Sequence, residues 1–482
     1  MPKKNIDSSE RHILSKTSFI KSIQCQKQVF LYKNRFFLRD KLTPEKLAIY
    51  KRGHKVGKLA WELFPNGIDV SPKSPMQYDK ALIQTQNLIK LGQRVLYEAS
   101  FRFNQCLCIL DMLISENSQI IAYEVKSSLS ITETYLYDAA FQYYVMSGAD
   151  FTPEHFYLVY VNPNYVLENH FSASEYFIIE EVTSQLIALQ PVISAKVEEA
   201  KGTIQLPKTP TISIGLHCEK PYQCDFLGFC RKYIPSSNVF SLTDLSSEEK
   251  YQLYRQGKVK LENIHTDEIE SFIAKLQFDS HKNHKEIIEN SNLVEKEIQV
   301  GCFIWDSPAI PIIEGHKPYT PVLMAYFWKN ATDINSQISS IIYKKEEDYS
   351  QFLKKARSII SEKSIITYDS SNCNLLLDIN NQFTSLYSWL KEKKYYHPDL
   401  NGDYSLEKIS EILYGKDGLE NNPFIQKTKN TIFHHEGMKT AIISAFENKD
   451  ELCNEAFEFA SKEVYKIEKV WKSIMKKRQN AI

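Results

Sequence analysis

The chain has 482 residues, which at roughly 100–200 residues per domain predicts two or three domains with ample core. Lys and Arg together number 59, as do Asp and Glu, so the net charge is zero and indicates no partner. Hydrophobic residues make up 43% of the chain, which excludes the disordered and collagen-like classes. No apolar run approaches the ~18–20 residues of a membrane span, and the N-terminal residues do not resemble a secretory signal, so we expect a cytoplasmic protein without a membrane partner.

Charge is distributed unevenly along the chain. Residues 1–100 hold 19 Lys and Arg against 8 Asp and Glu, whereas residues 101–200 hold 3 against 13. Two differently solvated surfaces would explain this pattern. The uneven charge is also expected of a basic surface that binds a polyanion beside an acidic pocket that can hold cations.

In chain order, the first part of the sequence predicts an α/β core. Apolar spacing predicts helices over 12–63, 83–96, 132–147 and 176–201. Runs of β-branched and aromatic residues predict strands over 101–115, 120–128 and 155–166. The first two strands flank a polar turn, which predicts a hairpin, and the resulting order is αββαβ. Thr43 followed by Pro44 marks a helix start, with Thr43 as the N-cap.

The second part of the sequence is also predicted to be α/β. Strands are expected at 297–305, 321–328 and 364–368, and helices at 247–275, 348–362, 373–393, 405–413, 436–447 and 450–478. The domains are therefore expected at 1–235 and 291–482, joined by a helical linker over 236–290.

Two carboxylates and a lysine form the first chemically informative pattern, Asp111-x₁₂-Glu124-x-Lys126. Alternate side chains on a strand share a face, so Glu124 and Lys126 point the same way, and hairpin pairing lets Asp111 converge on them. Such a set suits Mg²⁺ or Mn²⁺ with oxygen ligands, plus a charge that orients water or steadies a phosphate. Glu98, one strand earlier, is a further candidate ligand. The alternative is a chance match with a surface ion pair, but these charges follow an apolar strand, where unpaired burial is costly.

This pattern resembles the PD-(D/E)XK nucleases of the RecB-like branch, which includes the CRISPR adaptation exonuclease and helicase–nuclease subunits with iron–sulfur clusters. The matching elements are Asp111, Glu124-x-Lys126, the Gln-Tyr-Tyr triplet at 142–144 and the stretch GHKVGKLAWELFPNG at 53–67. The resemblance implies that His54 is a metal ligand or lies beside one, although a lone His on a basic helix is more often simply exposed.

The same resemblance assigns roles to the remaining site residues. It implies that Asp111 and Glu124 hold the metal and that Lys126 positions the attacking water. Gln142 and Tyr143 would contact DNA or the scissile phosphate.

The spacing of the cysteines is the second informative pattern. Cys218, Cys224 and Cys230 follow one another too widely for a two-residue zinc knuckle. Four thiolates can hold a [4Fe–4S] cluster or a zinc ion, and Cys25 is the candidate for the fourth ligand. Three unligated cysteines in a loop are the remaining alternative.

The nuclease resemblance favours iron at these cysteines. In the iron–sulfur members of that group, one cysteine precedes the core and three follow it, which matches Cys25 and the 218–230 set. We therefore expect a [4Fe–4S] cluster, with zinc as the second choice. Cys106 and Cys108 alternate on a strand and are expected to be ordinary core residues.

The second half resembles the C-terminal domain that accompanies this nuclease type in a bacterial family of unknown function. The matching stretches are 308–328 and 395–415. That domain is similar to DnaQ-type, ribonuclease H-like exonucleases, whose chemistry requires four acidic residues that bind two metals.

This sequence departs from the exonuclease pattern. Cys302 and its neighbours stand where the first-strand acids are expected, and Asp306 is displaced toward the strand end. The middle segment offers only Asp369, and Glu463 stands where an Asp is expected. We therefore expect an inactive domain that guides DNA or binds a protein partner.

Together these patterns predict a bacterial Mg²⁺- or Mn²⁺-dependent DNA nuclease, an exonuclease on single-stranded ends, in repair, processing or phage defence. The alternative is a non-catalytic DNA-binding subunit of a helicase–nuclease or defence complex. A redox or radical enzyme is excluded, because the chain has no Cys-x₃-Cys-x₂-Cys motif and no Gly-rich cofactor loop.

Overall fold

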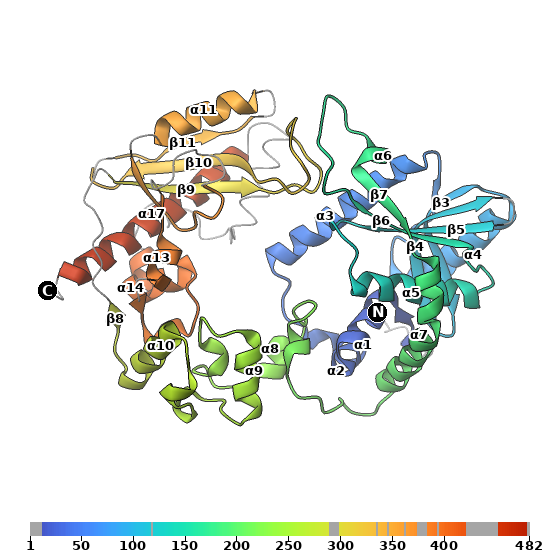
Figure 1. Cartoon of the computed structure of the whole chain (residues 1–482), viewed down its shortest axis with the longest axis horizontal. Helices are drawn as coiled ribbons and strands as arrows, with labels where there is room; N and C mark the ends of the chain where they lie inside the picture. Colours follow the sequence, from blue (N-terminus) through green and yellow to red (C-terminus); the bar gives the residue numbers. More distant parts are fainter. Residues whose placement is uncertain are drawn as a thin grey trace, which may run out of the picture. The chain divides into compact units, whose positions relative to one another are not determined.

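The computed structural model describes residues 12–116, 119–288, 298–333, 336–344, 347–360, 363–373, 383–392, 395–420 and 452–479. The chain divides into two compact units (Figure 1). Unit 1 consists of Met1–Tyr233 and Pro308–Thr320, and unit 2 of Ile234–Ser307 and Pro321–Ile482. Both units combine helices with a β-sheet, so the predicted α/β class is confirmed.

Unit 1 is built on a mixed sheet with the strand order β2-β3-β4-β5-β6-β7, and β1 pairs with β4. The strands are β1 (Leu14–Ser15), β2 (Ile68–Asp69), β3 (Val95–Phe103), β4 (Cys106–Glu116), β5 (Gln119–Lys126), β6 (His155–Val161) and β7 (Phe177–Glu181). Strands β3, β4 and β5 form an antiparallel meander, and β6 runs parallel to β5. The edge strand β7 is antiparallel to β6.

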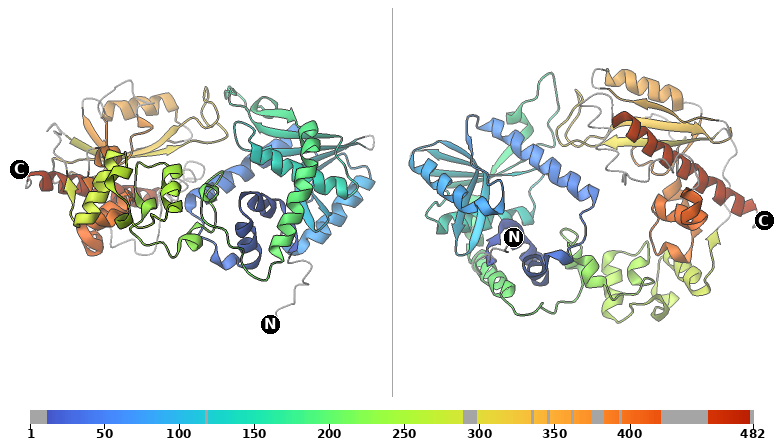
Figure 2. Two further views of the ribbon diagram at one scale, coloured as in Figure 1. Left: turned by 60° about the horizontal axis from the view of Figure 1, so that its bottom comes forward. Right: turned by 180° about the vertical axis from the view of Figure 1, so that it is seen from behind.

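Helices cover both faces of this sheet (Figure 2). They are α1 (Lys16–Gln24), α2 (Gln26–Asn34), α3 (Pro44–Ala60), α4 (Tyr78–Lys90), α5 (Glu133–Gly148), α6 (Ala173–Tyr176), α7 (Thr183–Ile204) and α8 (Leu227–Arg231). One face packs against α1, α2, α5 and α7, with Phe19 and Phe141 stacked at its centre. The other face packs against α3 through Val56 and Ala60. As predicted, Thr43 caps α3 and Pro44 begins it.

Two details of the predicted order in unit 1 were wrong. The stretch predicted as one strand over 101–115 turns at Asn104 and Gln105, whose φ angles are 48° and 59°. Left-handed backbone at two consecutive residues suits a tight hairpin turn, so this stretch supplies the end of β3 and all but the last residue of β4. The predicted helix over 176–201 begins later, because β7 precedes α7. The core order is therefore helix, three strands, helix and strand.

The segment Pro308–Thr320 belongs to unit 1, although its sequence was grouped with the second domain. Its Ala309 lies in the core beneath α3, and the Ala309 carbonyl accepts a hydrogen bond from the Tyr176 hydroxyl at 2.9 Å. The Tyr319 hydroxyl donates to the backbone carbonyl of Ser127, directly after β5. This segment therefore contacts the chain immediately beyond Lys126.

Unit 2 is built on a sheet with the order β11-β10-β9-β12-β13. The strands are β9 (Ile298–Asp306), β10 (Val322–Asn330), β11 (Ser339–Ile342), β12 (Ser364–Thr367) and β13 (Phe383–Ser385). Strands β9, β10 and β11 are antiparallel neighbours, whereas β12 is parallel to β9 and β13 is parallel to β12. A separate pair joins β8 (Ile287–Ile288) to β14 (Tyr395–Tyr396).

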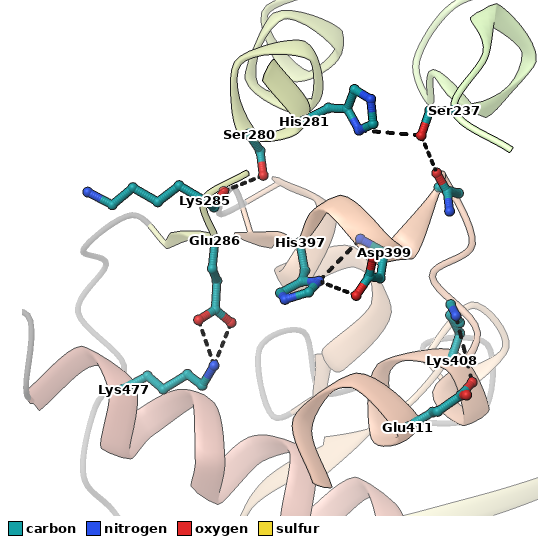
Figure 3. Close-up of polar contacts among 11 residues, drawn as sticks. Ser237, Ser280, His281, Lys285, Glu286, His397, Asp399, Lys408, Glu411 and Lys477 are labelled. Carbon is teal, nitrogen blue, oxygen red and sulfur yellow. Dashed lines mark hydrogen bonds and ion pairs between the residues drawn. The ribbon is translucent and has the colours of Figure 1, made fainter. Parts of the chain in front are cut away.

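The helices of unit 2 are α9 (Ser247–Arg255), α10 (Phe272–Asn283), α11 (Tyr349–Ile360), α13 (Leu386–Glu392), α14 (Leu406–Glu420) and α17 (Leu452–Gln479). Helix α17 packs on β9 and β10, and a buried ion pair at 2.8 Å joins Lys329 of β10 to Glu468. Both Glu286 oxygens lie 2.6 Å from Lys477 Nζ, which ties α17 to the residue before β8 (Figure 3).

The predicted helix over 247–275 was wrong in its length, because α9 ends at Arg255 and Gly257 follows with a φ of 81°. The predicted helix over 436–447 lies outside the described residues. None of the described helices is both long and apolar enough to span a membrane.

Candidate active site in unit 1

Three carboxylates occupy one row across β3, β4 and β5. The β3–β4 ladder keeps one register on both sides of Glu98 and Asp111, so these two residues stand opposite each other. Asp111 and Glu124 are the next opposed pair beyond the last pair of the β4–β5 ladder. Asp111 Oδ2 also accepts a hydrogen bond from the backbone nitrogen of Val125 at 2.6 Å. Sheet pairing therefore brings together the predicted Glu98, Asp111 and Glu124.

An irregularity in the meander marks this row. Leu96 and Ala99 of β3 both belong to the core beneath α5 although they are three residues apart, and so do Leu110 and Leu113 of β4. Regular strands alternate faces every residue, so both strands switch phase between these positions. Glu98 has a φ of 58°, which is uncommon for a residue with a β-carbon. Strand irregularities of this kind often re-aim side chains beside active sites.

Two lysines meet at Glu124. Lys126 Nζ and Lys16 Nζ each lie 2.7 Å from Glu124 Oε1. Lys126 Nζ also lies 2.5 Å from Asp138 Oδ2. Glu124 is 1% exposed, and its second oxygen, Oε2, is buried without a hydrogen-bond partner among the described residues.

Burial and charge set the protonation of the row. Burial raises the pKa of Glu124, but Lys126 and Lys16 outweigh it and hold this pKa well below its usual range. Burial and the charge of Glu124 raise the pKa of Asp111 well above its usual range. The same two causes raise the pKa of Glu98 to about 7. A cation near the row would favour ionisation of all three carboxyl groups.

Helix α5 carries Asp138, Gln142 and Tyr143, whose side chains differ in their contacts. Asp138 holds Lys126, and Gln142 follows one turn later on the same helix face. Gln142 is fully buried, and neither its Oε1 nor its Nε2 has a hydrogen-bond partner among the described residues. Tyr143 is 8% exposed and packs in the core beneath the helix.

His54 is exposed on α3, and no described hydrogen bond or ion pair joins it to the carboxylate row. From the same helix, Lys58 acts on Glu98 by lowering its pKa against the effect of burial. The guanidinium of Arg52 lies over the ring of Tyr319, 5.2 Å from its centroid. The side of α3 near the row is therefore basic.

Sequence reasoning missed Lys16 and Asp138. Asp138 carried a usable signal, because it precedes Gln142 by four residues on a predicted helix. Lys16 carried none, because it lies 108 residues from Glu124 in the chain.

The predicted cysteine ligands line one cavity. Cys25 separates α1 from α2, Cys218 and Cys224 lie in the loop after α7, and Cys230 lies on α8. Burial, together with the neighbouring thiols, raises the pKa of the Cys224 thiol to about 12. A bound metal would stabilise the thiolate form that burial disfavours.

Polar contacts fasten the cysteine loop to the N-terminal helices. Gln24 Nε2, beside Cys25, donates to the carbonyls of His217 and Tyr222 at 2.8 and 2.6 Å. Asp225, beside Cys224, pairs with basic side chains from the N-terminal region. Residues far apart in the sequence therefore meet at the same cavity.

Within the described ranges, no group of three or more His, Cys, Asp or Glu side chains is arranged so that it could hold a metal ion. At the row, Glu124 Oε1 faces Lys16 and Lys126, and Asp111 Oδ2 accepts the bond from Val125. Two ammonium groups on Oε1 would repel a cation that approached Oε2, so metal binding would favour movement of a lysine away from Glu124.

The acidic residues of unit 2 are engaged in local contacts. Asp306 Oδ1 accepts a hydrogen bond from the backbone nitrogen of Ser307, and Asp369 accepts hydrogen bonds from Ser371 within its own turn. Glu463 on α17 pairs with Lys466 at 2.8 Å. The thiol of Cys302 is buried on β9, and burial together with Glu463 raises its pKa.

Among the described residues of unit 2, His281 and His397 are not arranged with a serine and a carboxylate as in a hydrolase triad (Figure 3). Ser237 Oγ lies 3.4 Å from His281 Nδ1 and 3.4 Å from Asn401 Oδ1. His397 pairs with Asp399, its near neighbour in sequence, at 3.8 Å. In the part of the chain that the structure describes, no carboxylate is shown to orient His281.

A search with protein-family models finds no match to this chain, and a search of curated proteins finds no significant match.

Proposed function

We propose that the chain is a Mg²⁺- or Mn²⁺-dependent deoxyribonuclease with its active site at the carboxylate row of unit 1. The observation that carries this proposal is the placement of Glu98, Asp111 and Glu124 in one cross-strand row, with Lys126 two residues beyond Glu124.

The donor set of the row fits a divalent cation. Glu124 Oε2 is buried and has no hydrogen-bond partner in the part of the chain that the structure describes, and the raised pKa values of Asp111 and Glu98 reflect crowded acidic groups in a poorly solvated place. Hard cations prefer such carboxylate oxygens. Asp111 and Glu124 are the proposed ligands, with Glu98 beside them.

The chain's own residues would bind and orient the scissile phosphate. When bound at the row, a divalent ion supplies a polarised water and neutralises charge on the phosphodiester. Lys126, held by Asp138, is placed to stabilise charge that develops on the phosphate. The buried Gln142 amide would hold a polar group of the substrate or its water.

Single-stranded DNA or single-stranded ends are the proposed substrate. Helix α3 exposes Lys51 and Lys58, and the first hundred residues carry most of the positive charge of unit 1. Such a surface binds the phosphate backbone without reading sequence.

A [4Fe–4S] cluster is the proposed occupant of the cysteine cavity, with Cys25, Cys218, Cys224 and Cys230 as ligands. Its role would be to join the α1–α2 junction to the loop after α7. Unit 2 is proposed as a ribonuclease H-like domain without a working active site. The parallel addition of β12 and β13 beside an antiparallel meander supports that fold, and the local pairing of its acids supports the loss of activity.

A cleavage assay tests the proposed function. Anaerobically purified full-length protein is incubated with end-labelled single- and double-stranded DNA and Mn²⁺. Wild type should cleave and Asp111→Ala should not. Glu116→Ala is the matched control, because Glu116 lies on the same strand, is half exposed and pairs only peripherally with Arg94 at 3.4 Å.

One observation favours the second candidate, a non-catalytic DNA-binding subunit. Two ammonium groups already neutralise Glu124, so the charge of this carboxylate is balanced without a metal. If folded wild type binds DNA but cleaves neither substrate, this second candidate replaces the nuclease.

A further inference from the structure

The backbone around Lys16 is fixed by contacts with its own helix cap and with the sheet. Lys16 is the first residue of α1, and Ser15 caps that helix by accepting the backbone N–H of Ser18. Leu14, two residues before Lys16, pairs with Cys106 of β4. The backbone of Lys16 is therefore fixed on the sheet, and its side chain does not reach Glu124 by chance from a mobile end.

The two lysines at Glu124 are held unequally. Lys126 Nζ has two close acceptors, Glu124 Oε1 at 2.7 Å and Asp138 Oδ2 at 2.5 Å. Lys16 Nζ has Glu124 Oε1 at 2.7 Å, whereas Asp138 Oδ2 lies at 3.9 Å. A cation that binds Glu124 in place of the lysines would therefore leave Lys126 paired with Asp138. Lys16 would lose its closest carboxylate partner.

Exposure also favours movement of Lys16. Its side chain is 28% exposed, whereas that of Lys126 is 14% exposed. A lysine can keep its stem packed while its ammonium group moves into water. Lys16 can thus leave Glu124 without unfolding α1, whose buried Phe19 stacks on Phe141 at 4.5 Å.

We propose that the ammonium group of Lys16 pairs with Glu124 in the metal-free protein and is displaced when a divalent ion binds the row. This inference rests on the proposed function. Lys16 is a positioning residue in this scheme: it keeps the row neutral and folded without metal, and it weakens metal binding by competing for Glu124.

Binding of Mn²⁺ alone to the full chain tests the proposal, with free Mn²⁺ followed by electron paramagnetic resonance. Lys16→Met keeps the aliphatic stem and removes the competitor, so it should tighten Mn²⁺ binding by about tenfold, within the usual range of coupling between two sites. Lys16→Arg retains the charge and should bind no more tightly than wild type. Lys21→Met is the matched control, because Lys21 lies on the same helix and pairs with Asp225 at 2.6 Å.

Thermal unfolding supplies a second measurement on the same proteins. Lys16→Met should unfold at a lower temperature than wild type in EDTA, and saturating Mn²⁺ should reduce that difference. Lys21→Met should show the same deficit with and without Mn²⁺.

The outcomes separate this inference from the proposed function. If Glu124→Gln abolishes Mn²⁺ binding but Lys16→Met binds Mn²⁺ as wild type does or more weakly, Lys16 is not a competitor and the inference is overturned. If wild type has no Mn²⁺ site that Glu124→Gln removes, the proposed metal site fails and the inference fails with it.

Discussion

We expect the ion pairs of Asp225 to stabilise the packing of the cysteine loop against the N-terminal helices. Its side chain is 8% exposed, and its oxygens lie 2.6 Å from Lys21, 3.2 Å from Arg39 and 3.5 Å from Lys46. Asp225→Asn keeps the shape of the side chain but leaves three cations without their shared counter-charge.

The expected cost follows from burial. Removing one partner of a fully buried ion pair destabilises a protein by about 3–5 kcal/mol. The side chains of Lys21, Arg39 and Lys46 are 15%, 18% and 29% exposed, so water can hydrate them in place. We therefore expect a loss of about 2–3 kcal/mol. At about 2–4 °C per kcal/mol for a unit of this size, the unfolding midpoint should fall by roughly 5–10 °C.

Circular dichroism during heating measures the midpoint, and hydrogen–deuterium exchange of α1 and α3 peptides shows whether the loss is local. Glu199→Gln is the control, because Glu199 and Lys196 are 2.8 Å apart but nearly half exposed, and such pairs contribute about 0–1 kcal/mol. A midpoint for Asp225→Asn that equals that of the control would refute the reasoning.

Three further predictions concern the site and its surroundings. Asp138→Asn should lower the rate of DNA cleavage by about 10–100-fold at unchanged DNA affinity, because Lys126 loses the carboxylate that orients it. Steady-state kinetics would measure the rate, and a binding titration would measure the affinity. An unchanged rate would remove Asp138 from the site. Cys224→Ser should lose iron and visible absorbance, whereas Cys106→Ala, in the sheet core, should retain both. If Cys224→Ser retains iron, Cys224 is not a ligand of the cluster. Burial lowers the pKa of Lys33 to about 8, below the roughly 10.4 of an unfolded lysine, so the unfolded chain binds more protons between these values. Denaturant unfolding should therefore show wild type gaining stability relative to Lys33→Met from about pH 8 to 10, and a pH-independent difference would contradict this.

Local patterns located two of the three strands that carry the carboxylate row, but not β3, which carries Glu98 and begins at Val95 within the helix predicted over 83–96. Apolar and aromatic runs located β4, β5 and β6, and strand alternation placed Lys126 on the same side as Glu124. The hairpin at Asn104 was missed because an Asn-Gln turn is a weak signal inside a long apolar run. Both residues there adopt positive φ, which tertiary pairing of β3 with β4 stabilises.

Long-range contacts could not be predicted in this way. Lys16 reaches Glu124 because Leu14 pairs with β4, and nothing near Lys16 in the sequence signals that pairing. The segment Pro308–Thr320 joins unit 1 through Ala309 and Tyr319, whose apolar surfaces would suit either core. Periodicity reports which face of an element is buried, but it does not report the element against which that face packs.

In the proposed function, the carboxylate row cleaves DNA with the help of Lys126. The most direct measurement is Mn²⁺-dependent cleavage of end-labelled single-stranded DNA by Lys126→Ala and wild type, with DNA affinity and folding measured on the same samples. We predict that wild type cleaves and that Lys126→Ala loses about 10²–10³-fold or more in rate while it still folds and binds DNA. Equal cleavage by the two proteins would contradict the site assignment.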